Sequence, residues 1–308
     1  MKILIVGSGG IGGYFGARLA AGGSDVTFVA RGAHLQAMRR EGLHVRSPLG
    51  DLHLRQIKTI ETVSEASDVE LVIVAVKLWD TEEVAASLAP LANKGAVVVS
   101  FQNGVQKDEV LGGYIRPSAI LGGVSYIAAV IESPGVIAHS GAMQKLIFGG
   151  YGAEASVRAT RFFEECRKAG IDAEINFAIE RLIWEKFVFL VGLSGTTAKY
   201  GSPIGPIREN PAKRRVLHRA MQEVVSVGRA KGIPLSADFA DNRLAFCDSI
   251  PATMTSSMEG DLARGKRLEL PWLSGAVVSI GEKLGVPTPV NADIVRQLEP
   301  AVMGRNVT

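Results

Sequence analysis

Lys186 is a charged residue within an otherwise apolar stretch, RLIWEKFVFLVGLSGTTAKYGSP at residues 181–203. Residues 187–193 are apolar on every side, so a helix here must be buried. At helical spacing Lys186 shares a face with Leu182, Ile183, Leu190, Leu193 and Thr197. A lysine in an apolar pocket can donate a proton to a carbonyl oxygen during reduction, if a carboxylate offsets its lost hydration. The alternative is a lysine that buries only its stem and keeps its ammonium in water.

A glycine pattern, GSGGIG at residues 7–12, directly follows the apolar run KILIVG. Glycine at the first position allows a tight turn, at the third it lets a pyrophosphate approach the backbone, and at the sixth it lets the helix pack on the strand. The positive N-terminus of the following helix would attract the phosphates. We therefore expect this segment to bind a dinucleotide through Gly7, Ser8, Gly9, Gly10, Ile11 and Gly12. The alternative is a glycine-rich turn without a ligand.

Arg31 stands near the end of the second predicted strand, where sites that prefer NAD usually carry an acidic residue. An arginine here can pair with a 2′-phosphate through two parallel hydrogen bonds. Lys77, after the strand LVIVAV, is a second cation at the same rim. Together they predict NADP(H) as the cofactor, although a surface arginine at a strand end is also common.

Asn103 belongs to the segment FQNG at residues 101–104, which follows another strand end. Ligands of open α/β sheets bind at such strand ends, and the Asn103 amide offers both a donor and an acceptor close to the expected nicotinamide. Asn-Gly is also a frequent turn pair, so turn formation alone could explain it.

Composition excludes several classes of protein. The chain has 308 residues, of which 47% are hydrophobic and 21% charged, enough for a sizeable core and two domains. A net charge of +3 without a long basic run argues against a nucleic-acid partner. Cys166 and Cys247 are too few for a disulfide scaffold and lack the spacing of metal ligands. No segment has the apolar length of a membrane span. We expect a soluble, cytoplasmic protein with no metal site.

Short strands and helices alternate in the first half of the chain. Strands are predicted at 2–7, 25–30, 71–76 and 96–101, and helices at 11–21 and 81–92. This order favours a parallel sheet of the Rossmann type, an α/β fold. Segments 135–141 and 145–150 look like a hairpin at the sheet edge, followed by a helix at 154–169 and a strand at 171–175.

The second half is predicted to be helical throughout. Helices are expected near 178–198, 209–232, 236–248, 251–265, 271–285 and 290–303. We expect a nucleotide-binding domain at residues 1–175 and an all-α substrate and catalytic domain at 176–308, with the ligand in the cleft between them. The apolar helices of the second domain could form a homodimer interface or only a core.

Several motifs in this order resemble the ketopantoate reductase (2-dehydropantoate 2-reductase) family over nearly the whole chain. They are KILIVGSGGIGG, VKLWDT, FQNGV, WEKF, TSSMEGDLARGKRLELPWLSG and GVPTPVN. The resemblance implies the two-domain fold and NADPH-dependent reduction of ketopantoate to pantoate, in pantothenate and coenzyme A synthesis. It also implies roles for single residues. Lys186 is the catalytic acid, Glu269 is the carboxylate near it, and Ser257 contacts the substrate carboxylate in the implied active site. In the implied cofactor site, Asn103 lies at the nicotinamide and substrate, Arg31 and Lys77 at the 2′-phosphate, and residues 7–12 at the pyrophosphate.

The chain departs from the family pattern in the expected substrate pocket. The family usually carries asparagines where this chain has Leu190 and Ser194, and a further asparagine where it has Ile204. Asp80 replaces a frequent glutamine on the adenosine side. Ser194 can still offer one hydrogen bond to the substrate. The predicted pocket is therefore more apolar, and a 2-oxoacid other than ketopantoate is an open alternative.

Two other functions fit the same fold. One is a dehydrogenase that acts on a 3-hydroxyacid or an imine, which would place its catalytic lysine in a different motif. The other is a non-catalytic sensor of NADP(H), which would need no proton donor. The pairing of Ser257 with Glu269 counts against the dehydrogenase, and Lys186 and Glu269 count against the sensor.

Overall fold

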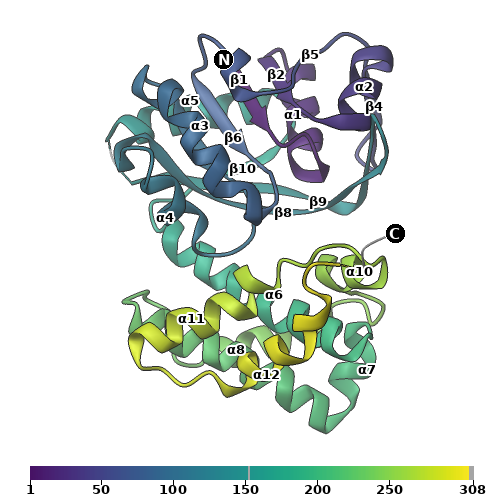
Figure 1. Ribbon diagram of the computed structural model, residues 1–308, viewed down its shortest axis with the longest axis vertical. Coiled ribbons are helices and arrows are strands. Elements are labelled where there is room, and N and C mark those ends of the chain that lie inside the picture. Colours follow the sequence, from purple (N-terminus) through teal and green to yellow (C-terminus); the bar gives the residue numbers. More distant parts are fainter. Residues whose placement is uncertain (152, 305–308) are drawn as a thin grey trace. The chain divides into compact units, whose positions relative to one another are not determined.

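A ten-stranded sheet forms the centre of the N-terminal half, in the order β4-β3-β9-β8-β7-β6-β1-β2-β5, with β10 paired to β9 (Figure 1). The computed structural model describes residues 1–151 and 153–304 of the chain. Neighbours among β8, β7, β6, β1, β2 and β5 run parallel. The strands are β1 Lys2–Val6, β2 Asp25–Val29, β3 Leu43–Arg46, β4 Leu52–Leu54, β5 Lys58–Ile60, β6 Leu71–Val74, β7 Val97–Ser100, β8 Ile120–Ser133, β9 Val136–Gly150 and β10 Asp172–Ile175.

Helices cover both faces of this sheet, because its central strands are apolar on both sides. They are α1 Gly10–Ala21, α2 Gly32–Glu41, α3 Thr81–Asn93, α4 Lys107–Gly112 and α5 Ala153–Lys168. Residues of β1 alternate between two cores: Ile3 and Ile5 belong to the core that contains Phe15 of α1, and Leu4 to the one that contains Leu88 of α3. The result is a doubly wound, Rossmann-type layer arrangement, as the alternating pattern predicted.

The long hairpin of β8 and β9 differs from the sequence prediction. Segments 135–141 and 145–150 are not two strands of an edge hairpin but two parts of the single strand β9, whose hairpin partner is β8. β9 also pairs with β3 and β10, so it lies inside the sheet. The β8–β9 register shifts between Ile127 and Ala128 and again between Ile131 and Ser133. Such irregularities interrupt the strict alternation on which the prediction depended. The segment 32–60, with α2 and β3 to β5, was not predicted.

Helices make up the C-terminal half, as the sequence predicted (Figure 1). They are α6 Ile179–Tyr200, α7 Ile204–Glu209, α8 Pro211–Ala230, α9 Phe239–Ser249, α10 Ser257–Ala263, α11 Ser274–Leu284 and α12 Pro289–Leu298. The start of the helix predicted at 209–232 is corrected to Pro211, because the side chain of Asn210 accepts hydrogen bonds from the amides of Ala212 and Lys213 and caps α8 there.

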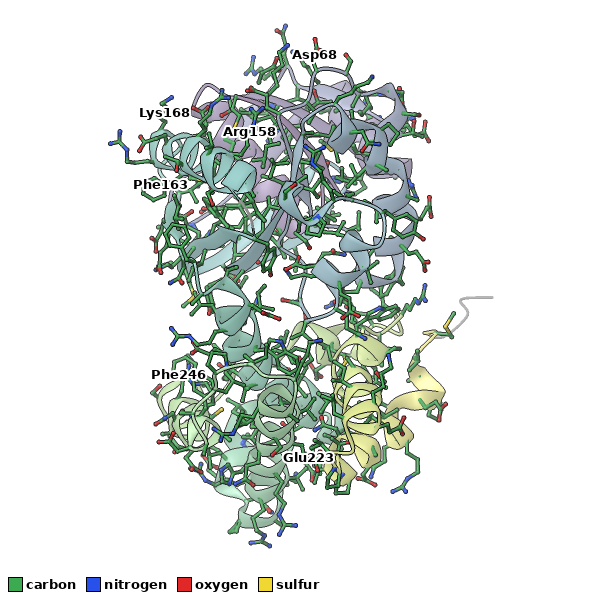
Figure 2. The ribbon with its side chains drawn as sticks, turned by 90° about the vertical axis from the view of Figure 1, so that its left-hand side faces the viewer. Asp68, Arg158, Phe163, Lys168, Glu223 and Phe246 are labelled. Carbon is green, nitrogen blue, oxygen red and sulfur yellow. The ribbon has the colours of Figure 1, made fainter. Side chains whose placement is uncertain are left out.

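A buried carboxylate joins two of these helices. Glu223 on α8 accepts hydrogen bonds from the amides of Val290 and Asn291, at 2.7 and 2.9 Å, and from the Asn291 side chain (Figure 2). These amides belong to the first turn of α12, so Glu223 satisfies donors that the helix itself leaves unpaired.

Internal contacts divide the chain into two units. The first comprises Met1–Asn103 and Lys107–Ile179, and the second Gly104–Gln106 and Glu180–Thr308. Residues 152 and 305–308, which the predicted domains include, lie outside the described residues. Across the described ranges, none of the helices combines the length and apolar character that a membrane span requires.

Candidate functional site

The candidate nucleotide residues of the first unit all follow parallel neighbouring strands. Gly7 follows β1, Arg31 follows β2, Lys77 follows β6 and Asn103 follows β7. Parallel strands end at the same edge of a sheet, which is where open α/β sheets bind their ligands. The topology therefore brings these residues to one edge, although they are far apart in the sequence.

The glycine loop is shaped by close backbone packing. Gly7 has a φ of +98°, a conformation that disfavours other residues, and a Cβ there would lie 2.6 Å from the amide nitrogen of Val76. A Cβ at Gly12 would collide with the carbonyl oxygen of Gly7. The sequence did not reveal why residue 10 must be glycine. A Cβ at Gly10 would collide with the carbonyl oxygen of Ala129 on β8.

The space around Gly9 is open. Gly9 is the N-cap of α1, and a Cβ added there would meet no atom of the described residues within 4 Å. The first turn of α1 carries no acidic residue that would repel an anion. The Ser8 hydroxyl points elsewhere, since it donates to the carbonyl of Val29 at 2.9 Å. A ligand would therefore meet backbone amides of this loop rather than the Ser8 side chain.

Two exposed cations lie at the same edge. Arg31 is the N-cap of α2, and one nitrogen of its guanidinium lies 3.3 Å from the carboxylate of Glu83 on α3. The ammonium of Lys77 lies 5.7 Å from the ring centre of Trp79. Exposed cations of this kind can pair with a phosphate without a large desolvation cost.

The loop that carries Asn103 is held by its buried neighbour Gln102. Gln102 accepts from the hydroxyl of Ser100 at 2.9 Å and donates to the Val76 carbonyl and the Thr81 hydroxyl, at 3.0 and 2.8 Å. Asn103 itself is half-buried, and Gly104 has a φ of +89°, as an Asn-Gly turn favours. Turn geometry and a ligand contact are thus both compatible with Asn103.

Lys107 is a buried lysine that sequence reasoning missed. Its ammonium donates to the carbonyls of Ser100 and Gly123, each at 3.0 Å, and lies 3.3 Å from the Asp108 carboxylate. Burial lowers the pKa of Lys107 below its ordinary value, and Asp108 opposes that shift. Lys107 thus joins β7 to β8 where their ladder ends, next to the Asn103 loop. A lysine after a predicted turn carries no local signal of burial.

The helical unit carries the candidate catalytic residues. Lys186 lies on α6 and is half-buried, less enclosed than its apolar surroundings predicted. Glu269, also half-buried, directly precedes the short helix Leu270–Trp272. Ser257 is exposed at the start of α10, whereas the neighbouring Ser256 is buried, caps that helix and lies 2.8 Å from the Thr197 hydroxyl.

The three positions of the predicted apolar pocket have different surroundings. Leu190 is half-buried on α6 and packs against the helical core. Ser194 is fully buried, and its hydroxyl finds no hydrogen-bond partner among the described residues. Ile204 is fully buried within that core, and its amide donates to the Met254 carbonyl at 2.9 Å. Packing explains Ile204, so the substrate prediction now depends on Leu190 and Ser194.

Comparisons with known proteins give one consistent family. A family model described as ketopantoate reductase PanE/ApbA matches residues 3–152, and one for the C-terminal part of the same family matches residues 178–301. A 2-dehydropantoate 2-reductase from Halobacterium salinarum is 31% identical over 300 residues, which cover 96% of this chain and 98% of the relative.

Solved structures agree. A PanE/ApbA family ketopantoate reductase from Ralstonia eutropha matches with a TM-score of 0.89 and 28% identity, over 98% of both chains. D-mandelate dehydrogenase, solved with NADH and anilino(oxo)acetate, matches with a TM-score of 0.89 over 98% of both chains. Its identity is only 22%, so this second likeness concerns the fold.

Proposed function

Because this chain belongs to the ketopantoate reductase family and is an oxidoreductase, we propose that it reduces a 2-oxoacid to the 2-hydroxyacid with NADPH. The leading substrate is 2-dehydropantoate (ketopantoate), reduced to pantoate for pantothenate and coenzyme A synthesis. The observation that carries this proposal is the common sheet edge at which the glycine loop, Arg31, Lys77 and Asn103 lie.

Residues 1–175 are proposed to bind the cofactor and residues 176–308 to carry the substrate and the proton donor. The loop at residues 7–12 binds the pyrophosphate through amides other than that of Ser8, which donates to the Val29 carbonyl at 3.3 Å, and the open space at Gly9 supports this role. Arg31 and Lys77 pair with the 2′-phosphate, and Asn103 donates to the nicotinamide or the substrate. Bound NADPH supplies the hydride that the reaction needs.

The remaining chemistry belongs to side chains of the helical unit. Lys186 donates a proton to the carbonyl oxygen as negative charge develops there, and its own charge stabilises that oxygen beforehand. Glu269 keeps the Lys186 ammonium protonated. Ser257 donates a hydrogen bond to the substrate carboxylate, and its exposed position leaves its hydroxyl accessible.

A more apolar 2-oxoacid is the second candidate substrate. The observation that favours it is Leu190, a half-buried apolar side chain at a position where the family pattern has asparagine. A pocket without that amide cannot strongly favour a hydroxylated molecule over its deoxy analogue.

The test is the loss of NADPH absorbance in a stopped-flow instrument, measured for a panel of 2-oxoacids that includes ketopantoate and α-ketoisovalerate. Each acid is also tested with NADH, because a protein of the same fold was solved with NADH. Turnover of one acid with preference for NADPH is the expected result. Binding of NADPH without turnover of any acid would instead indicate a sensor, and a gain of NADPH absorbance when NADP⁺ is mixed with a 3-hydroxyacid would indicate a different dehydrogenase.

A further inference from the structure

His34 joins two segments that are distant in the sequence. Its Nε2 lies 2.9 Å from the carbonyl oxygen of Ser8 in the glycine loop. Its Nδ1 accepts a hydrogen bond of 3.0 Å from the amide of Gly135, at the turn between β8 and β9. His34 itself lies in the first turn of α2, whose N-cap is Arg31. One imidazole ring therefore connects the pyrophosphate loop, the helix of the 2′-phosphate arginine and the hairpin tip.

The hairpin tip is packed tightly against these elements. Gly135 has a φ of +80°, and a Cβ there would lie 3.1 Å from Cβ of Ala37 on α2. Farther along the hairpin, the Ala129 carbonyl lies against Gly10 at the start of α1. The hairpin therefore packs against the glycine loop. His34 forms hydrogen bonds both to the tip of the hairpin and to the loop.

The two hydrogen bonds determine which ring nitrogen carries the proton. The amide of Gly135 can only donate, so Nδ1 must be unprotonated and Nε2 carries the hydrogen that it donates to Ser8. A second proton on Nδ1 would face the amide hydrogen of Gly135 and break that bond. Burial lowers the pKa of His34 below its ordinary value of 6.5, while the bond to Ser8 opposes the shift. The environment thus favours the neutral ring.

The charged side chains near His34 form ion pairs with other residues. On α2, Arg31 pairs with Glu83. Near the hairpin tip, Glu132 pairs with Arg46 at 2.7 Å.

On β3, the amide of His44 donates to the Gly135 carbonyl, and its ring stacks on that of His53 at 3.6 Å. Glu41, at the end of α2, pairs with Arg40 and accepts from the His53 ring through its carbonyl. Burial lowers the pKa of His44 as well, and His53 contributes to that shift. A pH dependence of cofactor binding can therefore arise from His34 or from His44. Substitution of each histidine in turn separates the two.

We propose that neutral His34 is a positioning residue of the dinucleotide site, and that its protonation weakens binding of the cofactor. This inference rests on the proposed function, because it assumes that the loop at residues 7–12 binds a dinucleotide. With both bonds intact the loop and Arg31 are held in place before the ligand arrives, so binding does not have to order them. When the ring is protonated, the bond from the Gly135 amide breaks, and the hairpin tip no longer holds the ring that donates to the Ser8 carbonyl.

The experiment compares the natural protein with His34→Gln and His34→Leu. Glutamine offers an N–H donor and a carbonyl acceptor in place of the two ring nitrogens, but has no proton to gain in this pH range. Leucine removes both hydrogen bonds. The dissociation constant of NADP⁺, which tolerates acid, is measured by protein fluorescence at about pH 8 and about pH 5, on either side of the ordinary histidine pKa. The 2′-phosphate of NADP⁺ also titrates, with a pKa of about 6. Its titration contributes the same pH dependence of binding to all three proteins.

Three results support the proposal when found together. At about pH 8 His34→Gln should bind NADP⁺ as the natural protein does, and His34→Leu about 5- to 10-fold more weakly, because only part of the cost of losing both hydrogen bonds falls on binding. Between about pH 8 and about pH 5 the dissociation constant of the natural protein should rise at least about 3-fold more than that of His34→Gln. A His44→Gln variant should keep the pH dependence of the natural protein.

Other results overturn it. If the natural protein and His34→Gln show the same dependence on pH, the ring does not act through its protonation. If His34→Leu is folded by circular dichroism and binds as tightly as the natural protein, the ring does not position the loop. If the natural protein binds NADP⁺ at neither of the two pH values, the proposed function is wrong together with this inference. If it binds NADP⁺ but the variants give one of the two results above, only this inference is wrong.

Discussion

The guanidinium of Arg31 lies 3.3 Å from the carboxylate of Glu83, and the two side chains are 65% and 72% exposed. An exposed pair of this kind contributes at most about 1 kcal/mol to stability. Glu83 therefore holds Arg31 at this edge of the sheet only weakly. A phosphate group, which carries more charge than a carboxylate, can take its place.

Substitution of Arg31 should change cofactor preference. We expect Arg31→Ala to lower the preference for NADPH over NADH about 10- to 100-fold, because a charge-assisted pair contributes about 1.5–3 kcal/mol. The measurement is kcat/KM for both cofactors. Glu83→Gln is the matched control, because it removes the competing carboxylate and should leave the preference unchanged or raise it. Equal kcat/KM for the two cofactors in the natural protein would contradict this prediction.

Lys186 should be required for the chemical step but not for cofactor binding. We expect Lys186→Ala to lower kcat by about 10²–10⁴ while NADPH still binds, because the proton donor and the charge beside the oxyanion are lost. Glu269→Ala should also lower kcat, since an uncompensated ammonium has a lower pKa. Steady-state kinetics and cofactor titration test both parts. Near-full kcat in Lys186→Ala would show that this lysine only extends its ammonium into water.

Leu190 should weaken discrimination between hydroxylated and deoxy substrates. We expect Leu190→Asn to favour ketopantoate over α-ketoisovalerate by about 1–2 kcal/mol relative to the natural protein, for one recovered hydrogen bond. The comparison is kcat/KM for both acids with both proteins. Leu190→Met is the control, because it changes shape without adding a polar group. A natural protein that already favours ketopantoate several thousand-fold would mean that other residues supply the discrimination.

Lys107 should stabilise the first unit although it is buried. We expect Lys107→Met to lower the free energy of unfolding by about 1–3 kcal/mol, because Asp108 and two backbone carbonyls lose their donor. Removal of the desolvated ammonium offsets part of that loss. Urea unfolding followed by circular dichroism measures the change. Lys94→Met, at an exposed position, should change stability by less than about 0.5 kcal/mol. Equal effects of the two substitutions would show that the buried contacts of Lys107 contribute nothing.

Glu165 should make the protein sensitive to acid. Hydrogen bonds from Lys168 and Ser24, at 2.8 and 2.6 Å, lower the pKa of Glu165 from 4.5 to about 2. A lowered carboxylate pKa contributes stability that is present above pH 4.5 and is lost as the pH falls towards 2. After allowance for solvent screening, the natural protein should lose about 1–2 kcal/mol more than Glu165→Gln over this range.

Urea unfolding at neutral pH and at about pH 3 measures that difference. Glu164→Gln is the matched control, because its carboxylate is 45% exposed and pairs with Arg167 at the surface. It should retain the acid sensitivity of the natural protein. Identical losses in Glu165→Gln and the natural protein would rule out this role for Glu165.

Short-range patterns in the sequence determined the nucleotide half of the molecule. The order of strand, glycines and helix at residues 2–21 predicted β1, the loop and α1, because each depends on neighbours a few residues away. The positions of Arg31, Lys77 and Asn103 were also predictable, because each follows the end of a strand that local sequence specifies. The topology of parallel sheets then places these strand ends at one edge. The helical character of the second half was likewise predictable from periodicity.

Only the tertiary structure decided what surrounds those residues. The carbonyl of Gly123 lies 16 residues from Lys107, and the amide of Gly135 lies 101 residues from His34. No local pattern encodes such partners, because a hydrogen bond between distant segments depends on how the sheet and its helices pack. The β8–β9 hairpin is the clearest example: its register shifts break the alternation that marks a strand, yet its backbone lies against Gly10 and donates to His34. Packing of distant backbone, rather than residue type, therefore gives the glycine loop its fixed position.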